Sequence, residues 1–317
     1  MKYMDIAGKR VARIAFGSTD FGGKLSEAAA RELLDTYRQA GGNYIDTAHV
    51  YGDFVTPKNG ESEKVIGRWI SDNHLRQSVF LSTKGAHHRL GTEPLGRLSR
   101  EELRRDMSES LEALQTDCVD IYWLHRDNPA FTVGEVMETL QELIEDGCTK
   151  LIGASNWTTE RIVEANDYAS SHGLTRFYAN QPRFSLPVQP GPADRSLVQA
   201  DGMMLKMHRE RRMLMTPYSS QAHGLLYKLD TLGAEALRGS SAECMLTPEN
   251  LAIYARAKQL SRETGLSPAA LGLLWLCEQD FPLIPIVGAS RPQQLAPLME
   301  AADADISTAQ RDFLRGV

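Results

Sequence analysis

Three residues of types used in acid–base chemistry stand at or near the ends of short apolar runs in the first half of the chain. They are Asp46 in the run 44–47, Lys84 at the end of the run 79–84, and His125 at the end of the run 119–125. Each has an ordinary explanation when taken singly, as a turn residue, a solvated lysine or a packed histidine. Together, an acid, an ammonium group and an imidazole at the ends of successive strands can form a charge-balanced cluster facing one cavity.

A tyrosine, Tyr51, follows Asp46 in the loop 47–52. A phenol is a weak acid at neutral pH, but an ammonium group beside it stabilises the phenolate and makes it a stronger acid. Lys84, held in place by Asp46, is the candidate for that ammonium. Such a phenol can protonate a carbonyl oxygen while hydride reaches the carbon, with His125 polarising the same oxygen.

The elements that must position these side chains alternate between short β-branched runs and longer stretches of helical period. Eight strands are expected, at 13–17, 44–47, 79–84, 119–125, 150–155, 177–181, 213–218 and 283–287. Helix starts are marked by Ser99, Thr247, Ser267 and Ser307, and helix ends by Gly41, Gly147, Gly173 and Gly265. This repetition predicts an α/β protein with one (β/α)₈ barrel domain over 1–317, because no G-x-G-x-x-G motif supports an open doubly wound sheet.

Two further segments are expected to cover the ends of the barrel. Residues 1–13, which pivot at Gly8, are predicted to form a hairpin that plugs one end. Residues 187–204 begin without helical period and with several prolines, so they are predicted to form a long loop over the mouth. Catalytic groups of such barrels lie at the C-terminal ends of the strands.

Composition narrows the class of partner and the compartment. The formal charge is −6, from 35 basic and 41 acidic side chains, and no basic block is present, so neither nucleic acid nor an anionic membrane is an expected partner. Four cysteines without metal-site or disulfide spacing, and no long apolar segment, favour a soluble protein of the reducing cytoplasm without a structural metal. The oligomeric state stays open.

At these residues the chain resembles the aldo-keto reductase superfamily, and in particular its bacterial NADP-dependent enzymes. The resemblance runs from about residue 17 to 294 and is carried by four ordered motifs, 42–48 with Tyr51 and Gly52, then 82–84, then 120–125. It implies a barrel enzyme that reduces an aldehyde or ketone with NADPH. Tyr51 would be the acid, Lys84 and Asp46 would tune it, and His125 would orient the substrate.

The resemblance also implies a cofactor site. Ser155, Asn156 and Gln181 resemble residues that hold the nicotinamide carboxamide, and Tyr218 resembles the aromatic residue that stacks on the ring. The other positions implied are Ser219, Gln221, Gly288, Ser290, Arg291 and Gln294. Arg291 lies at a helix start suited to a phosphate and resembles the residue near the adenosine 2′-phosphate, which favours NADP(H) over NAD(H).

The chain departs from the family pattern at two places. Pro297 and Leu298 stand where relatives have Glu and Asn beside the adenine, and His223 stands where an arginine commonly faces the pyrophosphate. These changes put the adenine contacts in question but do not touch the reacting centre.

Four residues are candidates for a substrate pocket suited to a sugar-like or aryl carbonyl: Trp123, Trp157, Phe54 and His87. Ordinary packing is an equal explanation for each of them. Two other functions stay open. Metal-dependent hydrolysis would use His49, His87, His88 and His125, although their spacing is poor for a metal site. A redox-sensing subunit that binds NADP(H) without turnover would keep the fold.

Overall fold

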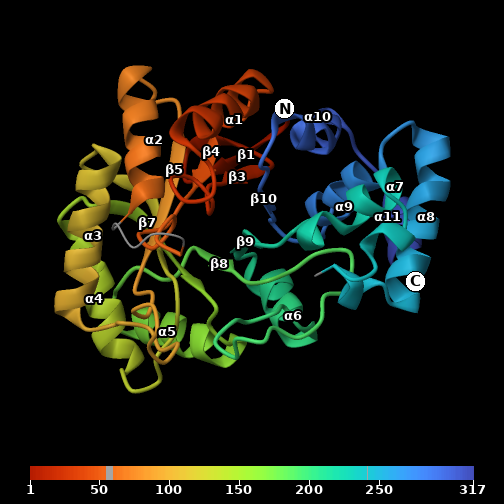
Figure 1. Ribbon diagram of the computed structural model, residues 1–317. Coiled ribbons are helices and arrows are strands. Elements are labelled where there is room, and N and C mark those ends of the chain that lie inside the picture. Colours follow the sequence, from red (N-terminus) through yellow and green to blue (C-terminus); the bar gives the residue numbers. More distant parts are fainter. Residues whose placement is uncertain (55–59, 241) are drawn as a thin grey trace.

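The core of the protein is one parallel sheet of eight strands in the order β10-β3-β4-β5-β6-β7-β8-β9 (Figure 1). The structure is a computed structural model and describes residues 1–54, 60–240 and 242–317. The strands are β3 (Ala15–Gly17), β4 (Tyr44–Asp46), β5 (Phe80–Gly85), β6 (Val119–Leu124), β7 (Thr149–Ser155), β8 (Ala179–Gln181), β9 (Leu214–Met215) and β10 (Ile286–Val287). Every strand predicted from the sequence is present, although several are shorter than expected.

The sheet curls until its two edges meet. On one side β10 pairs with β3 in parallel register. On the other, the backbone of β9 bonds to the segment that leads into β10: Met215 N donates to Pro282 O at 2.9 Å and Ile284 N donates to Met215 O at 2.9 Å. The predicted eight-stranded barrel is therefore confirmed.

Helices surround the barrel, as expected of strands joined by helical crossovers. They are α1 (Glu27–Gln39), α2 (Glu61–Asp72), α3 (Arg100–Leu114), α4 (Val133–Glu145), α5 (Thr159–Ser171), α6 (Gly202–Arg211), α7 (Leu225–Thr231), α8 (Pro248–Thr264), α9 (Pro268–Cys277), α10 (Ala296–Asp303) and α11 (Thr308–Arg315). Figure 1 shows α2 to α5 wrapped around one side of the sheet and α8 and α11 on the opposite side.

The predicted helix boundaries are also confirmed. The side chains of Ser99, Thr247, Ser267 and Ser307 each accept a hydrogen bond from the backbone of the first helical turn that follows. Gly41, Gly147, Gly173 and Gly265 all have positive φ, between 68° and 87°. Glycine adopts this backbone conformation without the steric penalty that a side chain would bring.

The N-terminal hairpin is formed by β1 (Tyr3–Ile6) and β2 (Lys9–Ala12), and it turns at Ala7 and Gly8, whose φ values are 49° and 80°. Ile6 and Val11 pack into the same apolar cluster as Phe80, Ile121 and Trp123 of the barrel. The hairpin therefore closes the end of the barrel away from the strands' C-terminal ends, as predicted.

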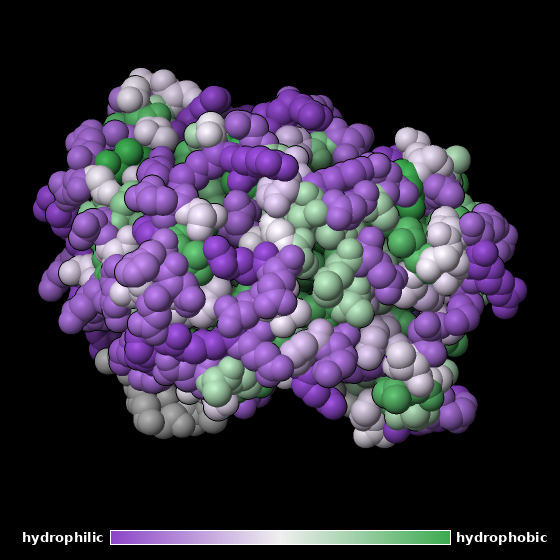
Figure 2. All heavy atoms as spheres, turned by 90° about the horizontal axis from the view of Figure 1, so that it is seen from above, coloured by the Kyte–Doolittle hydropathy of each residue, from purple (hydrophilic) through white to green (hydrophobic). Residues whose placement is uncertain are grey.

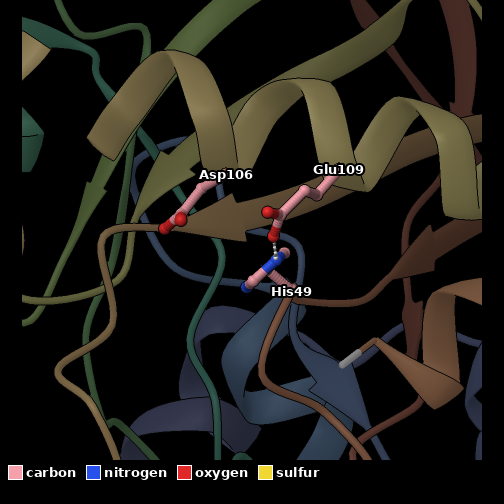
Figure 3. Close-up of side chains that lie close together, drawn as sticks. All are labelled: His49, Asp106 and Glu109. Atoms are coloured by element: carbon pink, nitrogen blue, oxygen red, sulfur yellow. Dashed lines mark hydrogen bonds and ion pairs between the residues drawn. The ribbon is translucent and has the colours of Figure 1, made fainter. Parts of the chain in front are cut away.

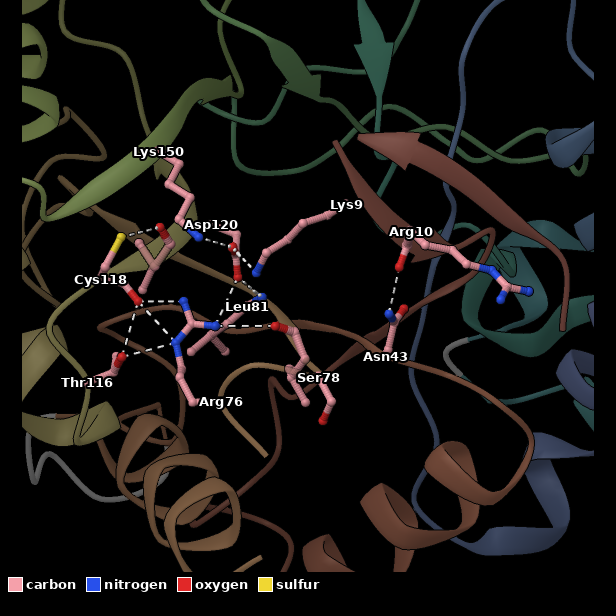
Figure 4. A network of polar contacts seen from close by, with 12 residues as sticks. Lys9, Arg10, Asn43, Arg76, Ser78, Leu81, Thr116, Cys118, Asp120 and Lys150 are labelled. Atoms are coloured by element: carbon pink, nitrogen blue, oxygen red, sulfur yellow. Dashed lines mark hydrogen bonds and ion pairs between the residues drawn. The ribbon is translucent and has the colours of Figure 1, made fainter. Parts of the chain in front are cut away.

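Polar contacts fasten this hairpin to the barrel (Figure 4). Lys9 Nζ lies 2.7 Å from Oδ1 of Asp120, a β6 residue that is 1% exposed. Arg76 and Lys150 contact the same carboxylate at 3.1 and 3.3 Å. Burial raises the pKa of Asp120, but Lys9, the Leu81 amide and Arg76 outweigh it, so the net pKa is lowered. Asp120 is a structural anchor.

The loop between β8 and α6 passes over the opposite end of the barrel. Its residues Asp194 and Leu197 line the cavity described below, and Arg183 N donates to Val198 O at 2.9 Å. The prediction of a long loop over the mouth is confirmed in this part, and its end is corrected: α6 begins at Gly202 because Asp201 caps it.

The surface seen in Figure 2 is mostly hydrophilic, with apolar residues scattered singly or in small groups. Within the described residues, no helix combines the length and apolar character needed to cross a membrane.

Candidate active site

Lys84 and Asp46 form a buried ion pair in the barrel. Lys84 Nζ lies 2.5 Å from Asp46 Oδ2 and also donates to Thr47 O at 2.7 Å. The other carboxylate oxygen of Asp46 accepts from Ser82 Oγ at 2.7 Å and from Gln181 Nε2 at 3.1 Å. Burial lowers the pKa of Lys84, but the attractions of Asp46 and Tyr51 outweigh it and raise the net pKa, so Lys84 is an ammonium at neutral pH.

Tyr51 lies against this pair. The Lys84 ammonium is 4.6 Å from the centre of the Tyr51 ring, and the His125 ring is edge-on to the same ring at 5.7 Å between centres. The turn that carries Tyr51 is fixed at both sides, because Tyr51 N donates to Ala48 O and Ser62 N donates to Tyr51 O. The four residues predicted to form one cluster are therefore brought together.

His125 is a neutral imidazole in this position. It is 7% exposed, and burial first, then nearby His87, Arg126 and Lys84, lower its pKa well below the ordinary value. Its Nδ1 is buried without a hydrogen-bond partner among the described residues. A buried polar atom of this kind is costly unless a ligand or water satisfies it.

A cavity of about 740 Å³ opens over the cluster. Asp46, Tyr51 and His125 line it at the ends of the strands, and it continues to the loop after β10. Its size is in the range of ligand pockets in proteins. One elongated ligand can therefore reach from the cluster to the start of α10.

The residues predicted to hold the nicotinamide line this cavity. Asn156, whose φ is 60°, accepts from the Tyr218 hydroxyl at 2.8 Å and donates to His125 O at 3.1 Å. Ser155 Oγ donates to Gln181 O at 2.8 Å. The four side chains form one polar network beside Asp46.

The remaining predicted cofactor residues divide into two groups. Those that line the cavity are Ser219, Gln221, Gly288, Ser290 and Gln294. Gln294 Oε1 accepts from Ser290 N at 2.7 Å, so it fixes the loop before α10. Arg291 is exposed and does not line the cavity as the structure describes it, although the residue before it, Ser290, does.

Of the three residues that depart from the family pattern, two line the cavity and one lies in the core. Pro297 and His223 line the cavity, whereas Leu298 is 1% exposed and packs in the core. His223 adopts a positive φ of 55° in the loop after β9.

Two of the four substrate-pocket candidates line the cavity as the structure describes it, and two do not. Phe54 and His87 line the cavity, but Trp123 and Trp157 are both fully buried away from it. Trp123 shares the inward face of β6 with His125 but lies two residues, roughly 7 Å, deeper in the barrel. Trp157 packs against Phe177 in the helix layer, with 5.5 Å between ring centres.

Several lining residues escaped the sequence analysis. They include Asp20, Arg126, Asp194, Leu197, Tyr227 and Lys228. Arg126 carried a usable signal, because it directly follows His125 at a strand end. Asp194 and Lys228 lie in a loop and a helix that only the folded chain brings to the mouth.

The four histidines considered for a metal site do not form one cluster. His87, His88 and His125 line the cavity: His87 stacks on His88 with 4.1 Å between ring centres, and it meets His125 edge-on at 4.7 Å. His49 lies elsewhere, next to Asp106 and Glu109 of α3, and its Nε2 is 2.7 Å from Glu109 Oε2 (Figure 3). Asp106 in turn pairs with Arg97 at 2.5 Å, so these contacts form an ordinary polar cluster.

Proteins with related sequences include a dehydrogenase, a reductase and a probable channel subunit. An aryl-alcohol dehydrogenase of Pestalotiopsis microspora is 27% identical over 95% of this chain and 77% of its own length. The norsolorinic acid reductase stcV of Emericella nidulans is also 27% identical, with the same coverage. A probable voltage-gated potassium channel subunit beta of Oryza sativa is 28% identical over 96% of this chain and 92% of its own.

The fold has a solved counterpart in a thermostable aldo-keto reductase crystallised with the inhibitor epalrestat. That structure superimposes with a TM-score of 0.76 at 21% sequence identity and covers 99% of both chains. The relatives named above come from fungi and a plant, so a bacterial source stays a prediction. Because residues 13–315 match the model of the Aldo/keto reductase family, this chain belongs to that family of oxidoreductases.

Proposed function

We propose that this protein reduces an aldehyde or ketone, aryl or sugar-like, to the alcohol with NADPH. The observation that carries the proposal is the buried Lys84–Asp46 pair set against Tyr51 and His125 at the floor of the cavity. This combination provides a fixed positive charge beside a phenol and a neutral imidazole at one point.

Each residue has a defined part in the proposed reaction. Tyr51 donates its hydroxyl proton to the carbonyl oxygen, and the Lys84 ammonium stabilises the phenolate that remains. Asp46 keeps Lys84 charged and in place. The neutral His125 ring orients the same oxygen by a hydrogen bond, which also satisfies a ring nitrogen.

The residues along the cavity fit a nicotinamide dinucleotide, which would supply the hydride when bound. Ser155, Asn156 and Gln181 provide amide and hydroxyl groups next to Asp46, and Tyr218 provides an aromatic face. A Cβ added to Gly288 would meet no atom within 4 Å, so backbone at the far end is open to a ligand. We propose Arg291 as the group that favours the 2′-phosphate of NADP(H).

A direct test follows NADPH by its absorbance. Its consumption is measured with a panel of aryl aldehydes, sugars and aliphatic ketones, and its formation from NADP⁺ is measured with aryl alcohols. We expect turnover with at least one aryl aldehyde and slower turnover with NADH. No oxidation of NADPH across the panel, by a protein shown calorimetrically to bind NADPH, would contradict the proposal.

A second candidate is a subunit that binds NADP(H) as a redox sensor without rapid turnover. The similarity to a probable potassium channel subunit beta favours it. Single-turnover measurement separates the two, because a sensor would bind NADPH and transfer hydride slowly to every carbonyl. We further propose that residues 1–317 form a single domain that works in the cytoplasm.

A further inference from the structure

A guanidinium group lies in the cavity wall beside the proposed reacting centre. Arg126 follows His125 where β6 ends, is 7% exposed, and lines the cavity together with Tyr51. The other lysine or arginine among the described lining residues, Lys228, comes from α7. Of the two cations that line the described part of the cavity, Arg126 is therefore the one that adjoins His125, which would hold a substrate carbonyl.

Among the described residues, the contacts of Arg126 leave much of its donor capacity unused. A guanidinium has five N–H donors. Nε donates to Ser196 Oγ at 3.0 Å and Nη1 donates to His125 O at 2.9 Å. Nη2 has Asp194 Oδ2 at 3.7 Å, too far for a hydrogen bond, and Asp194 Oδ1 accepts from the backbone and hydroxyl of Ser196 instead.

The groups around Arg126 do not neutralise it fully. Burial, and then Arg126 itself, lower the pKa of His87 to about 3, so His87 stays neutral. Burial also lowers the pKa of Arg126, although Tyr218, Asp194 and Tyr51 oppose this. A nearly buried cation with an open ion pair is unfavourable, and an anion that reaches it with two oxygens gains strong charge-assisted hydrogen bonds.

We propose that Arg126 recognises a carboxylate carried by the substrate, so that the cavity takes oxo-carboxylates: aldehydes or ketones with an anionic group a few bonds from the carbonyl. This inference rests on the proposed reductase function. The carbonyl oxygen meets Tyr51 and His125 while the carboxylate meets the guanidinium. Hydride from NADPH and the proton from Tyr51 convert the carbonyl to an alcohol. The carboxylate takes no part in the reaction.

The test compares 4-carboxybenzaldehyde with its methyl ester, methyl 4-formylbenzoate, which has a similar shape and no charge. With NADPH, we expect the parent to favour the acid in kcat/KM by at least about tenfold, mainly through KM. Arg126→Met should abolish this preference and Arg126→Lys should restore part of it. Asp194→Asn removes the competing carboxylate and should increase it.

The matched control is Arg89→Met, because Arg89 is exposed in the loop after β5 and its side chain has, among the described residues, one ion-pair partner, Glu102, at 3.9 Å. It should leave the acid-to-ester ratio unchanged. If Arg126 only holds the loop at Ser196, Arg126→Met will lower kcat/KM equally for the acid and the ester. That result overturns the proposal. An equal rate with acid and ester in the parent overturns it as well.

A binding measurement keeps the inference separate from the proposed function. Calorimetry with 4-methylbenzoate, an unreactive carboxylate, in the presence of NADP⁺ should give binding that Arg126→Met weakens at least about tenfold. Arg89→Met should not weaken it. If no aldehyde is turned over but Arg126→Met still weakens 4-methylbenzoate binding, the reductase function is wrong and the carboxylate site stands. If 4-methylbenzoate binds equally well to the parent and to Arg126→Met, the carboxylate site is wrong.

Discussion

Lys84 Nζ lies 2.5 Å from Asp46 Oδ2, although the two residues come from different strands and both are almost fully buried. Breaking a buried ion pair leaves the remaining charge uncompensated. Each residue therefore depends on the other for its effect on Tyr51.

This dependence predicts a non-additive pair of substitutions. Lys84→Met and Asp46→Asn should each slow hydride transfer by at least about 10²-fold, because each removes the fixed ammonium or its support. The double variant should lose clearly less than the product of the two. The measurement is the single-turnover rate with NADPH in the parent and three variants. If the two single losses multiply in the double variant, Lys84 and Asp46 act independently and the proposed dependence is wrong.

Arg291 should distinguish the two nicotinamide dinucleotides. Arg291→Ala is expected to weaken NADPH binding by about 1–3 kcal/mol and to leave NADH binding nearly unchanged, since only NADPH carries the 2′-phosphate. Fluorescence titration with both cofactors measures this. Equal losses would mean that Arg291 supports the loop before α10 instead of reading the phosphate.

Asp120 should contribute to stability and not to cofactor binding. Asp120→Asn is expected to lower the free energy of unfolding by about 2–3 kcal/mol, at the low end for a buried ion pair because Lys9 and Lys150 reach solvent. The pKa of Asp120 is lowered in the fold, so this contribution is present at neutral pH and is lost as the pH falls below about 4. Urea unfolding at two pH values tests it. Asp117→Asn, at an exposed carboxylate, is the control.

Glu63 of α2 should have the opposite pH dependence. Burial raises its pKa to about 7, and its Oε2 has no hydrogen-bond partner among the described residues. A raised carboxyl pKa gives stability that is complete below the ordinary value and is lost as the pH rises through 7. Glu63→Gln should therefore match the parent near pH 5 and exceed it at pH 8 by up to about 3 kcal/mol.

Urea unfolding of the parent and Glu63→Gln at both pH values measures this difference. Glu61→Gln, on the same helix but partly exposed, should show no such change. A Glu63→Gln effect that is the same at pH 5 and pH 8 would mean that Glu63 is ionised in the fold throughout.

The strands and the chemical cluster were predictable because both depend on local pattern. Alternation along a strand fixes which face a residue occupies, and this placed Lys84 and His125 correctly. It does not fix depth along the barrel axis, so Trp123 was expected at the mouth and lies in the layer below. Register between strands decides that depth.

Other features depend on contacts between distant segments. The partners of Asp120 are Lys9, Arg76 and Lys150, which come from three separate parts of the chain, so its anchoring role has no local signal. The role inferred for Arg126 also depends on a distant segment. Its open ion pair with Asp194 exists only because the loop after β8 crosses the mouth.

The most direct test of the proposed reaction is single-turnover hydride transfer from NADPH in Tyr51→Phe, with NADPH affinity measured in parallel by fluorescence. The substitution removes the acidic hydroxyl and keeps the ring that packs against Lys84 and His125. We predict that transfer to the best carbonyl substrate falls by at least about 10²-fold while NADPH binding is kept. Transfer at a rate near that of the parent would contradict the assignment of Tyr51 as the acid, and with it the proposed mechanism.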